Sequence, residues 1–318
     1  MSDMRILASL CLTATLVLTG AAQTSPDTQA LLGRWNLTGT GTDSNAVFWL
    51  EVKQENGQLT GMFLNRGGSP VKLGAVKVDN GTLEFTTAGT ANRPGQTHKA
   101  TLQGGKLTGS VTLGERTLTW VGVRPPTWAP ANANGAHTYG TPVELVDGKT
   151  LDAWRLQHPD RPAGWTFADG VMGTEAKANN LISKQTFKDF KIQAEYKIGT
   201  GSNSGIYLRG RYELQVVDDL GKDPEEHLHM AIYAWEKPLV NASKPSTEWQ
   251  TMEAVIVGNR VTVTLNGKRV HDNAQIQAIT GGALDANEEA PGPIVLQGDH
   301  GKVWFRKVTV TPIVKAGS

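Results

Sequence analysis

Short runs of alternating apolar and polar residues fill the chain from Gly33 onward, and amphipathic helical patterns are scarce. In residues 33–124, a turn containing glycine is followed each time by an alternating run. The repeats are NGQLTGMFL (56–64), NGTLEFTT (80–87) and GGKLTGSVTL (104–113). Successive hairpins of this kind predict a small up-and-down β-barrel or meander.

Residues 143–318 continue the alternation in strands of ordinary length, with no strand–helix–strand pattern that would indicate a parallel sheet. The predicted strands are DFKIQAEYKI (189–198), SGIYLRG (204–210), YELQVVD (212–218), TMEAVIVG (251–258), RVTVTLNG (260–267) and the pair within 291–308. This pattern favours an antiparallel two-sheet sandwich or jelly roll, so the predicted fold class is all-β.

The two predicted units are joined by residues 125–142, which are rich in Pro, Ala, Asn and Gly and read as a linker. Residues 1–22 combine Arg5, an apolar run and small residues, as in a cleavable signal peptide, and 23–32 form a leader. We therefore expect a periplasmic or secreted protein. The single cysteine, Cys11, lies inside the apolar run, so the mature chain should have no disulfide.

Composition excludes several classes of partner. The 318 residues are 39% hydrophobic, and 31 basic residues balance 30 acidic ones. Such a chain shows no electrostatic footprint for nucleic acid, and no membrane contact is expected once the signal peptide is removed. The sequence does not predict an oligomeric state.

Period-two alternation sorts the side chains of the predicted sandwich strands between the core and the opposite faces. If one sheet curves, the non-core residues could line a single polar surface of the kind that binds sugars. The alternative is an ordinary solvated face. The residues concerned are Glu195, Tyr207, Arg209, Glu213, Gln215 and Gln297.

DPEEHLHMAIYAW (223–235) places His227 and His229 two residues apart, shortly after Asp218. Two histidines on one strand face with a nearby carboxylate could bind a divalent metal. No further ligand has a diagnostic spacing, so no cofactor is firmly predicted. Tyr233, in the same segment, could stack on a sugar ring or pack at the rim.

PGPIVLQGDHGKVWFRKV (291–308) reads as strand, tight turn and strand, with Gln297 opposite the apolar positions. The turn needs Gly and Asp, but it does not need His300. This histidine is therefore a candidate functional residue, with turn capping as the structural alternative.

Residues 143–314 resemble the 3-keto-disaccharide hydrolase family, also described as 3-keto-glucoside lyases and hydratases. The stretches that carry the resemblance occur at 145–154, 164–172, 181–198, 203–218, 231–251, 264–273 and 292–310. Two departures are Lys307 after Arg306, where members often have Asn, and Ala234-Trp235, where members often have Gly-rich residues. The resemblance implies a concanavalin-like sandwich that acts on a glycoside or oligosaccharide whose C3 hydroxyl has been oxidised to a ketone.

That chemistry needs a base for the C2 proton, donors for an enolate oxygen and an acid for the departing oxygen. His300 could shuttle a proton, because its unperturbed pKa lies near neutral pH, while Asp299 orients it or shapes the turn.

Glu213 and Glu195 are alternative bases. Arg209 and Gln297 could hold the enolate oxygen or sugar hydroxyls. The remaining substrate-binding candidates are Asn203, Tyr207, Gln215 and Tyr233.

Two other functions fit the same pattern. The sandwich could bind carbohydrate without catalysis, or it could be an ordinary glycosidase acting on unoxidised sugar. In the second case Glu195 and Glu213 should flank one bond, roughly 5–10 Å apart.

Overall fold

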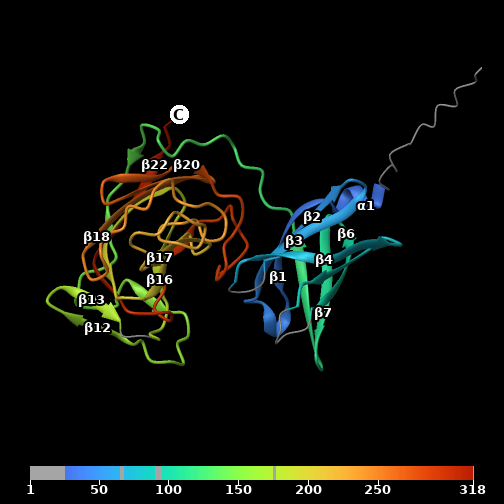
Figure 1. Cartoon of the computed structure of the whole chain (residues 1–318), viewed down its shortest axis with the longest axis horizontal. Coiled ribbons are helices and arrows are strands. Elements are labelled where there is room, and N and C mark those ends of the chain that lie inside the picture. Colours follow the sequence, from blue (N-terminus) through green and yellow to red (C-terminus); the bar gives the residue numbers. More distant parts are fainter. Residues whose placement is uncertain (1–25, 65–67, 90–94, 175–176, 318) are drawn as a thin grey trace, which may run out of the picture.

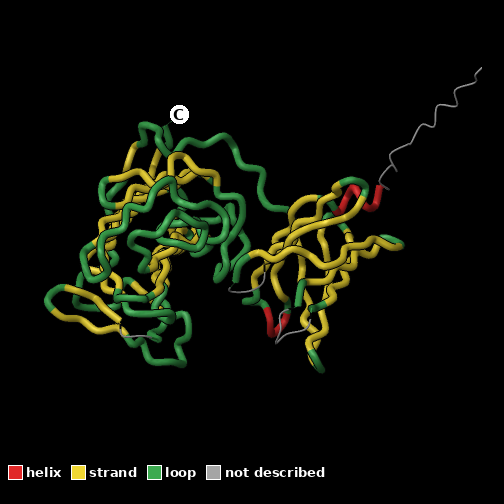
Figure 2. Tube along the Cα trace, viewed as in Figure 1, coloured by secondary structure: helices red, strands yellow, loops and turns green. Residues whose placement is uncertain are grey.

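The computed structural model describes residues 26–64, 68–89, 95–174 and 177–317, so the expected signal peptide lies outside the described residues. The chain forms two β-units side by side, joined by a long connection (Figure 1). The described residues form strands and loops (Figure 2), with short helical segments at α1 (Pro26–Leu31) and at the 3-10 turn η1 (Gly41–Asp43). None of the described helices is long and apolar enough to cross a membrane.

The N-terminal unit is a closed antiparallel barrel, as the repeated hairpins predict, and the first strand pairs with the last. Its strands are β1 (Gly33–Gly39), β2 (Val47–Glu55), β3 (Gln58–Leu64), β4 (Pro70–Asp79), β5 (Thr82–Thr87), β6 (Thr97–Gln103), β7 (Lys106–Leu113) and β8 (Arg116–Val123). The turns Asn56-Gly57 and Asn80-Gly81 have positive φ at both residues, which suits two-residue hairpin connections.

Residues 26–32 of the expected leader pack against the barrel. Leu31, at the end of α1, is buried in the barrel core, and the Trp35 indole donates to its carbonyl oxygen at 3.0 Å. The Arg124 guanidinium lies 3.6 Å from the Trp35 ring centroid and donates to the carbonyl oxygens of Ala30 and Leu32. The buried tryptophan and this cation fasten the N-terminal helix to the barrel.

The C-terminal unit is an antiparallel sandwich of two sheets. The larger sheet contains β12 (Trp165–Ala168), β13 (Val171–Thr174), β22 (Val303–Lys315), β15 (Phe190–Ile198), β18 (Gln250–Val257), β19 (Arg260–Leu265) and β20 (Lys268–Gln275), with β9 (Thr138–Tyr139) and β10 (Val143–Glu144) also pairing with β22. The smaller contains β11 (Trp154–Leu156), β14 (Leu181–Phe187), β21 (Gly292–Leu296), β16 (Asn203–Leu208) and β17 (Tyr212–Val217). The all-β prediction with a C-terminal sandwich is confirmed.

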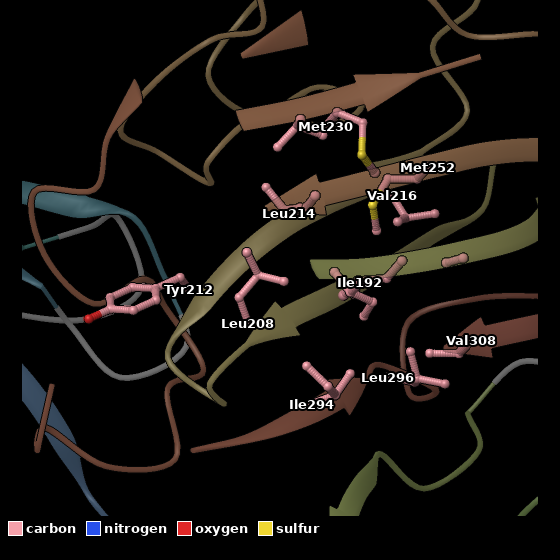
Figure 3. Close-up of a cluster of buried hydrophobic side chains, with 14 of the residues drawn as sticks. Ile192, Leu208, Tyr212, Leu214, Val216, Met230, Met252, Ile294, Leu296 and Val308 are labelled. Atoms are coloured by element: carbon pink, nitrogen blue, oxygen red, sulfur yellow. The ribbon is translucent and has the colours of Figure 1, made fainter. Parts of the chain in front are cut away.

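Alternate side chains of both sheets form the sandwich core, as the sequence pattern predicts. Figure 3 shows Leu214 and Val216 of β17 and Ile294 of β21 gathered with Ile192 of β15 and Val308 of β22. All five are buried. The same strands must therefore place their intervening residues on the outer faces of the sheets.

The connection between the units packs along the larger sheet. Ala133 is buried with Val255 and Val257 of β18, and its N–H donates to the Asn273 side chain at 2.8 Å. Strand β9 lies within residues 125–142 and pairs with β22, so structure of the sandwich begins inside the segment that the composition marks as linker.

Arg209, a predicted substrate-binding residue, is instead buried in the turn after β16 and does not line the pocket described below. Its side chain is 1% exposed and donates to the carbonyl oxygens of Lys188 and Gly258 and to the Asp189 carboxylate. The alternation rule fails because β16 ends at Leu208 and Arg209 has a positive φ of 54° in the turn that follows. The guanidinium therefore joins the turns before β15, after β16 and after β18.

We expect Arg209→Ala to lower the free energy of unfolding by about 3–5 kcal/mol, because it leaves Asp189 and two carbonyl oxygens without their donor. Arg306→Ala is the matched control, since Arg306 pairs with Glu195 on a part-exposed surface and should cost about 0–1 kcal/mol. Urea unfolding followed by circular dichroism measures both values. Equal losses in the two variants would contradict a structural role for Arg209.

Candidate active site

A pocket of about 210 Å³ opens on the face of the smaller sheet that points away from the core. It is lined mainly by amides, carboxyls, histidines and tyrosines. The lining residues are Gln157, His158, Asn180, Asn203, Tyr207, Glu213, Gln215, Tyr233, Gly281, Gly282, Val295, Gln297, Asp299 and His300. Such a surface offers many hydrogen-bonding groups with a small apolar part, which suits a hydroxyl-rich ligand.

Two neighbouring strands form the floor of this pocket. Tyr207 of β16 lies directly opposite Glu213 of β17, and Gly205 lies opposite Gln215. A side chain on Gly205 would collide with the Glu213 carboxyl, so the glycine leaves the space that this carboxyl occupies. Alternation along both strands therefore brings one carboxyl, one phenol and one amide together.

Two loop segments fasten β17 at its free edge. The Tyr233 N–H donates to the Glu213 carbonyl oxygen at 3.1 Å, and the Glu213 N–H donates to the Thr280 hydroxyl at 2.9 Å. Gly281 follows Thr280, and its carbonyl oxygen accepts from the Tyr207 hydroxyl at 3.1 Å. Segments far from β17 in sequence thus supply two walls of the pocket.

Glu213 is the most perturbed acid of the pocket. Burial raises the pKa of its carboxyl to about 8, against a hydrogen bond with Tyr207 and the charge of His300, which lower it. The same burial, helped by the Glu213 charge, raises the pKa of Tyr207 well above its usual value, so Tyr207 remains a neutral phenol. A carboxyl with this pKa can hold or release a proton near neutral pH.

His300 and Asp299 form a second proton-carrying unit at the mouth. His300 Nδ1 donates to Asp299 Oδ1 at 2.6 Å, and this bond raises the pKa of His300 despite partial burial. Burial alone would raise the pKa of Asp299, but hydrogen bonds from His300 and Asn180 outweigh it and lower the pKa. The Asn180 side chain also bonds the Gly298 N–H at 2.7 Å and Gln157 at 2.8 Å.

Two amide oxygens of the pocket are buried without a protein partner. Neither Asn203 Oδ1 nor Gln297 Oε1 has a hydrogen bond to any of the described residues. An unmet buried acceptor costs free energy, so such atoms favour a ligand that brings hydroxyl donors.

The pocket brings together most of the residues that the sequence singles out as candidates: His300, Asp299, Glu213, Gln215, Gln297, Asn203, Tyr207 and Tyr233. Sequence reasoning missed Gln157, His158, Asn180 and the Gly281-Gly282 pair, which lie on loops without a periodic pattern. Alternation in the SGIYLRG and PIVLQG runs predicts two strands, but it does not indicate which loops cover those strands.

Glu195 does not line this pocket. The prediction that it shares one polar surface with Glu213 is therefore wrong. Glu195 lies on β15 of the larger sheet, where its carboxylate accepts from Arg306 Nε at 2.6 Å, and it borders a separate groove with Gln193, Glu253 and Lys307. Alternation assigns a residue to a face, but it does not say which of the two sheets carries that face. Glu195 therefore cannot act with Glu213 on one bond.

The three weak metal candidates each have protein partners. His229 is buried between the Tyr196 hydroxyl and the backbone of Val217, and Asp218 accepts from the Gly201 N–H at 2.9 Å. His227 Nε2 lies 2.9 Å from the Ser69 hydroxyl. Among the described residues, no group of three or more His, Cys, Asp or Glu side chains could hold a metal ion.

A family model described as the 3-keto-α-glucoside-1,2-lyase-like domain matches residues 141–311, which is more than half of the chain. The chain belongs to this family. The lyase-like domain therefore contains the whole smaller sheet and every residue that lines the pocket, while the barrel lies outside it. Membership places the protein among carbohydrate-active proteins.

The chain is also similar to a 3-keto-disaccharide hydrolase of Bacteroides thetaiotaomicron, with 33% identity over 99 residues. The match covers 28% of this chain and 34% of that relative, so the chain spans about a third of its length. A structure described as a proposed glycosyl hydrolase from Parabacteroides distasonis has 26% identity and a TM-score of 0.49, covering 60% of this chain and 92% of that one. Caenorhabditis elegans lipid binding protein 8 matches 32% of this chain and 99% of its own, with 16% identity and a TM-score of 0.23.

We expect Glu213→Gln to flatten the pH dependence of stability. The folded carboxyl keeps its proton up to about pH 8, whereas the unfolded one releases it near pH 4.5, so rising pH costs the folded wild type free energy across this window. The variant should gain on the order of a few kcal/mol relative to wild type between pH 5 and 8. Urea unfolding at four pH values measures this. Parallel stability curves would show that Glu213 has an ordinary pKa.

Proposed function

We propose that this protein is an exported enzyme that cleaves 3-keto-glycosides by removing the C2 proton and expelling the C1 substituent. The observation that carries this proposal is the pairing, in one pocket, of a buried carboxyl with a raised pKa and a histidine–aspartate unit. Export rests on the apolar run and small residues within 1–22. Family membership supports the sugar substrate.

The reaction follows from the ketone. A carbonyl group at C3 acidifies the C2–H bond, and loss of that proton gives an enolate. The enolate re-forms the carbonyl and makes a C1–C2 double bond as the C1–O bond breaks. Water then adds across this double bond, with its hydroxyl at C1 and its proton at C2, so the net result is hydrolysis. No oxidant or reductant is consumed in these steps.

Glu213 serves as the base. A carboxylate whose pKa is about 8 is far more basic than an ordinary one, and near that pH half of it is ionised. Tyr207 remains a neutral phenol beside Glu213, and its hydroxyl donates to the Gly281 carbonyl oxygen at 3.1 Å, which fixes the phenol next to the carboxyl. The proton taken from C2 resides on Glu213 until it is returned to C2 during hydration.

His300 serves as the acid. The Asp299 carboxylate favours its protonated form, and its side chain is 52% exposed at the mouth, where a departing oxygen can accept a proton and leave. Asn203 Oδ1 and Gln297 Oε1, which have no partner among the described residues, accept hydrogen bonds from sugar hydroxyls. Tyr233 and Gln215 form the adjoining wall.

An ordinary glycosidase is the second candidate, because the pocket contains two carboxyls whose pKa values move in opposite directions. Burial raises that of Glu213, and hydrogen bonds lower that of Asp299. A protonated acid beside an ionised carboxylate is the usual equipment for hydrolysing an unoxidised glycoside.

We expect the purified mature protein to release the aglycone from a 3-keto-glucoside and to leave the parent glucoside intact. Mass spectrometry of both incubations, sampled from seconds to hours, measures release and detects a transient 2-hydroxy-glucal. Cleavage of the unoxidised glucoside would favour the glycosidase instead. Binding without cleavage of either sugar would indicate a carbohydrate-binding protein.

We expect His300→Ala to lower kcat on the keto sugar by about 10²- to 10⁴-fold, because the acid is removed. The unfolding free energy should stay within about 0.5 kcal/mol of wild type, since the side chain is half exposed. Added imidazole should restore part of the rate by supplying the missing proton donor. Wild-type turnover in this variant would remove His300 from the mechanism.

A further inference from the structure

The barrel contacts the sandwich through a pair of stacked tryptophans. Trp49 of β2 stacks on Trp235 of the sandwich, with ring centroids 5.2 Å apart. The Arg34 guanidinium lies 5.9 Å and 5.5 Å from the two rings. Its Nε and Nη1 atoms are buried and have no hydrogen-bond partner among the described residues. Burial lowers the pKa of Arg34, and the Glu51 and Glu288 charges oppose this, so a buried cation beside two aromatic rings joins the barrel to the sandwich.

One pocket wall is held directly by the barrel. The Trp49 indole donates to the Ile279 carbonyl oxygen at 3.2 Å, just before Gly281 and Gly282, which line the pocket. Gly281 lies so close to Gly68 of the barrel that any side chain on it would collide with the Gly68 carbonyl oxygen. The backbone of this wall is therefore clamped between the barrel and the Tyr207 hydroxyl.

A second contact between the barrel and the sandwich reaches the pocket wall that contains Tyr233 and Gln215. Ser69 of the barrel lies 2.9 Å from His227 Nε2, and the His227 ring meets Tyr233 edge to face, with centroids 5.1 Å apart. The His227 carbonyl oxygen accepts from Gln215 Nε2 at 3.4 Å. Tyr233 and Gln215 both line the pocket. His227 contacts both of them, so it links Ser69 to two lining side chains.

We propose that the barrel is a positioning element of the candidate active site, and that Ser69 fixes Tyr233 by orienting the His227 ring. The proposal extends the proposed function, because it assigns the barrel a role in holding the sugar. Binding groups work only when they are held within about 0.5 Å of their productive places. The Ser69 hydroxyl, supplied by another domain, gives His227 the fixed partner that its own loop does not.

The test compares Ser69→Ala with two controls. Ser69→Thr keeps the hydroxyl and should behave as wild type. Ser44→Ala removes an exposed barrel hydroxyl in the turn after η1 and should also be neutral. With a 3-keto-glucoside, Ser69→Ala should raise KM about 3- to 10-fold, the worth of one net hydrogen bond, and leave kcat within about twofold.

A second readout does not depend on any substrate. The chain has five tyrosines, so protein labelled with 3-fluorotyrosine gives five ¹⁹F resonances. Tyr233→Phe identifies the resonance of Tyr233. We expect Ser69→Ala to shift or broaden that resonance, and Ser69→Thr and Ser44→Ala to leave it in place. The melting temperature of all three variants should stay near that of wild type.

The outcomes separate the two proposals. An unchanged Tyr233 resonance in Ser69→Ala overturns the positioning role, whatever the activity. A displaced resonance with an unchanged KM also overturns it, because the wall would then not contact the sugar. A displaced resonance in a protein that never cleaves the keto sugar would leave the positioning role standing and would refute the proposed reaction.

Discussion

The burial of the Glu213 side chain is the constraint on which the pocket depends. Taking a carboxyl out of water is costly, and here the cost appears as a pKa raised to about 8. The surroundings that impose it come from Gly205 beneath the carboxyl, the neighbouring Tyr207 phenol, and the loops at Thr280 and Tyr233. A sheet surface that would otherwise be solvated thereby becomes a pocket around a carboxyl that can hold or release a proton near neutral pH.

One of the loops that bury Glu213 is held by a buried arginine, Arg211. The turn between β16 and β17 contains Arg209 and Arg211, both almost fully buried. Arg209 joins three turns of the sandwich, while Arg211 bonds Asp285 and the Ala290 carbonyl oxygen in the loop that continues from Gly282. Stability and site geometry are therefore coupled, because the same short turn fastens the core on one side and a pocket wall on the other.

The barrel shares in this arrangement, although it lies outside the family's domain. Val47, Trp49 and Leu64 belong to the same buried cluster as the sandwich core. Asn36 of the barrel bonds the Glu288 carboxylate at 2.7 Å, and that carboxylate also accepts from the buried Tyr212 hydroxyl at 2.9 Å. A module tethered by a linker would make few such contacts, so the two units are expected to behave as one body.

Local sequence patterns were enough to predict the all-β class, the barrel hairpins and the strands of the sandwich, because period-two alternation and Asn-Gly turns are local signals. It also brought forward Glu213, Gln297 and His300, since a polar residue opposite a core position, or a histidine in a tight turn, is visible without coordinates. The three-dimensional structure was needed to show that Glu195 belongs to the other sheet and that Arg209 is buried. Pairing between strands distant in sequence, loop packing and the docking of the barrel depend on contacts that no local pattern encodes.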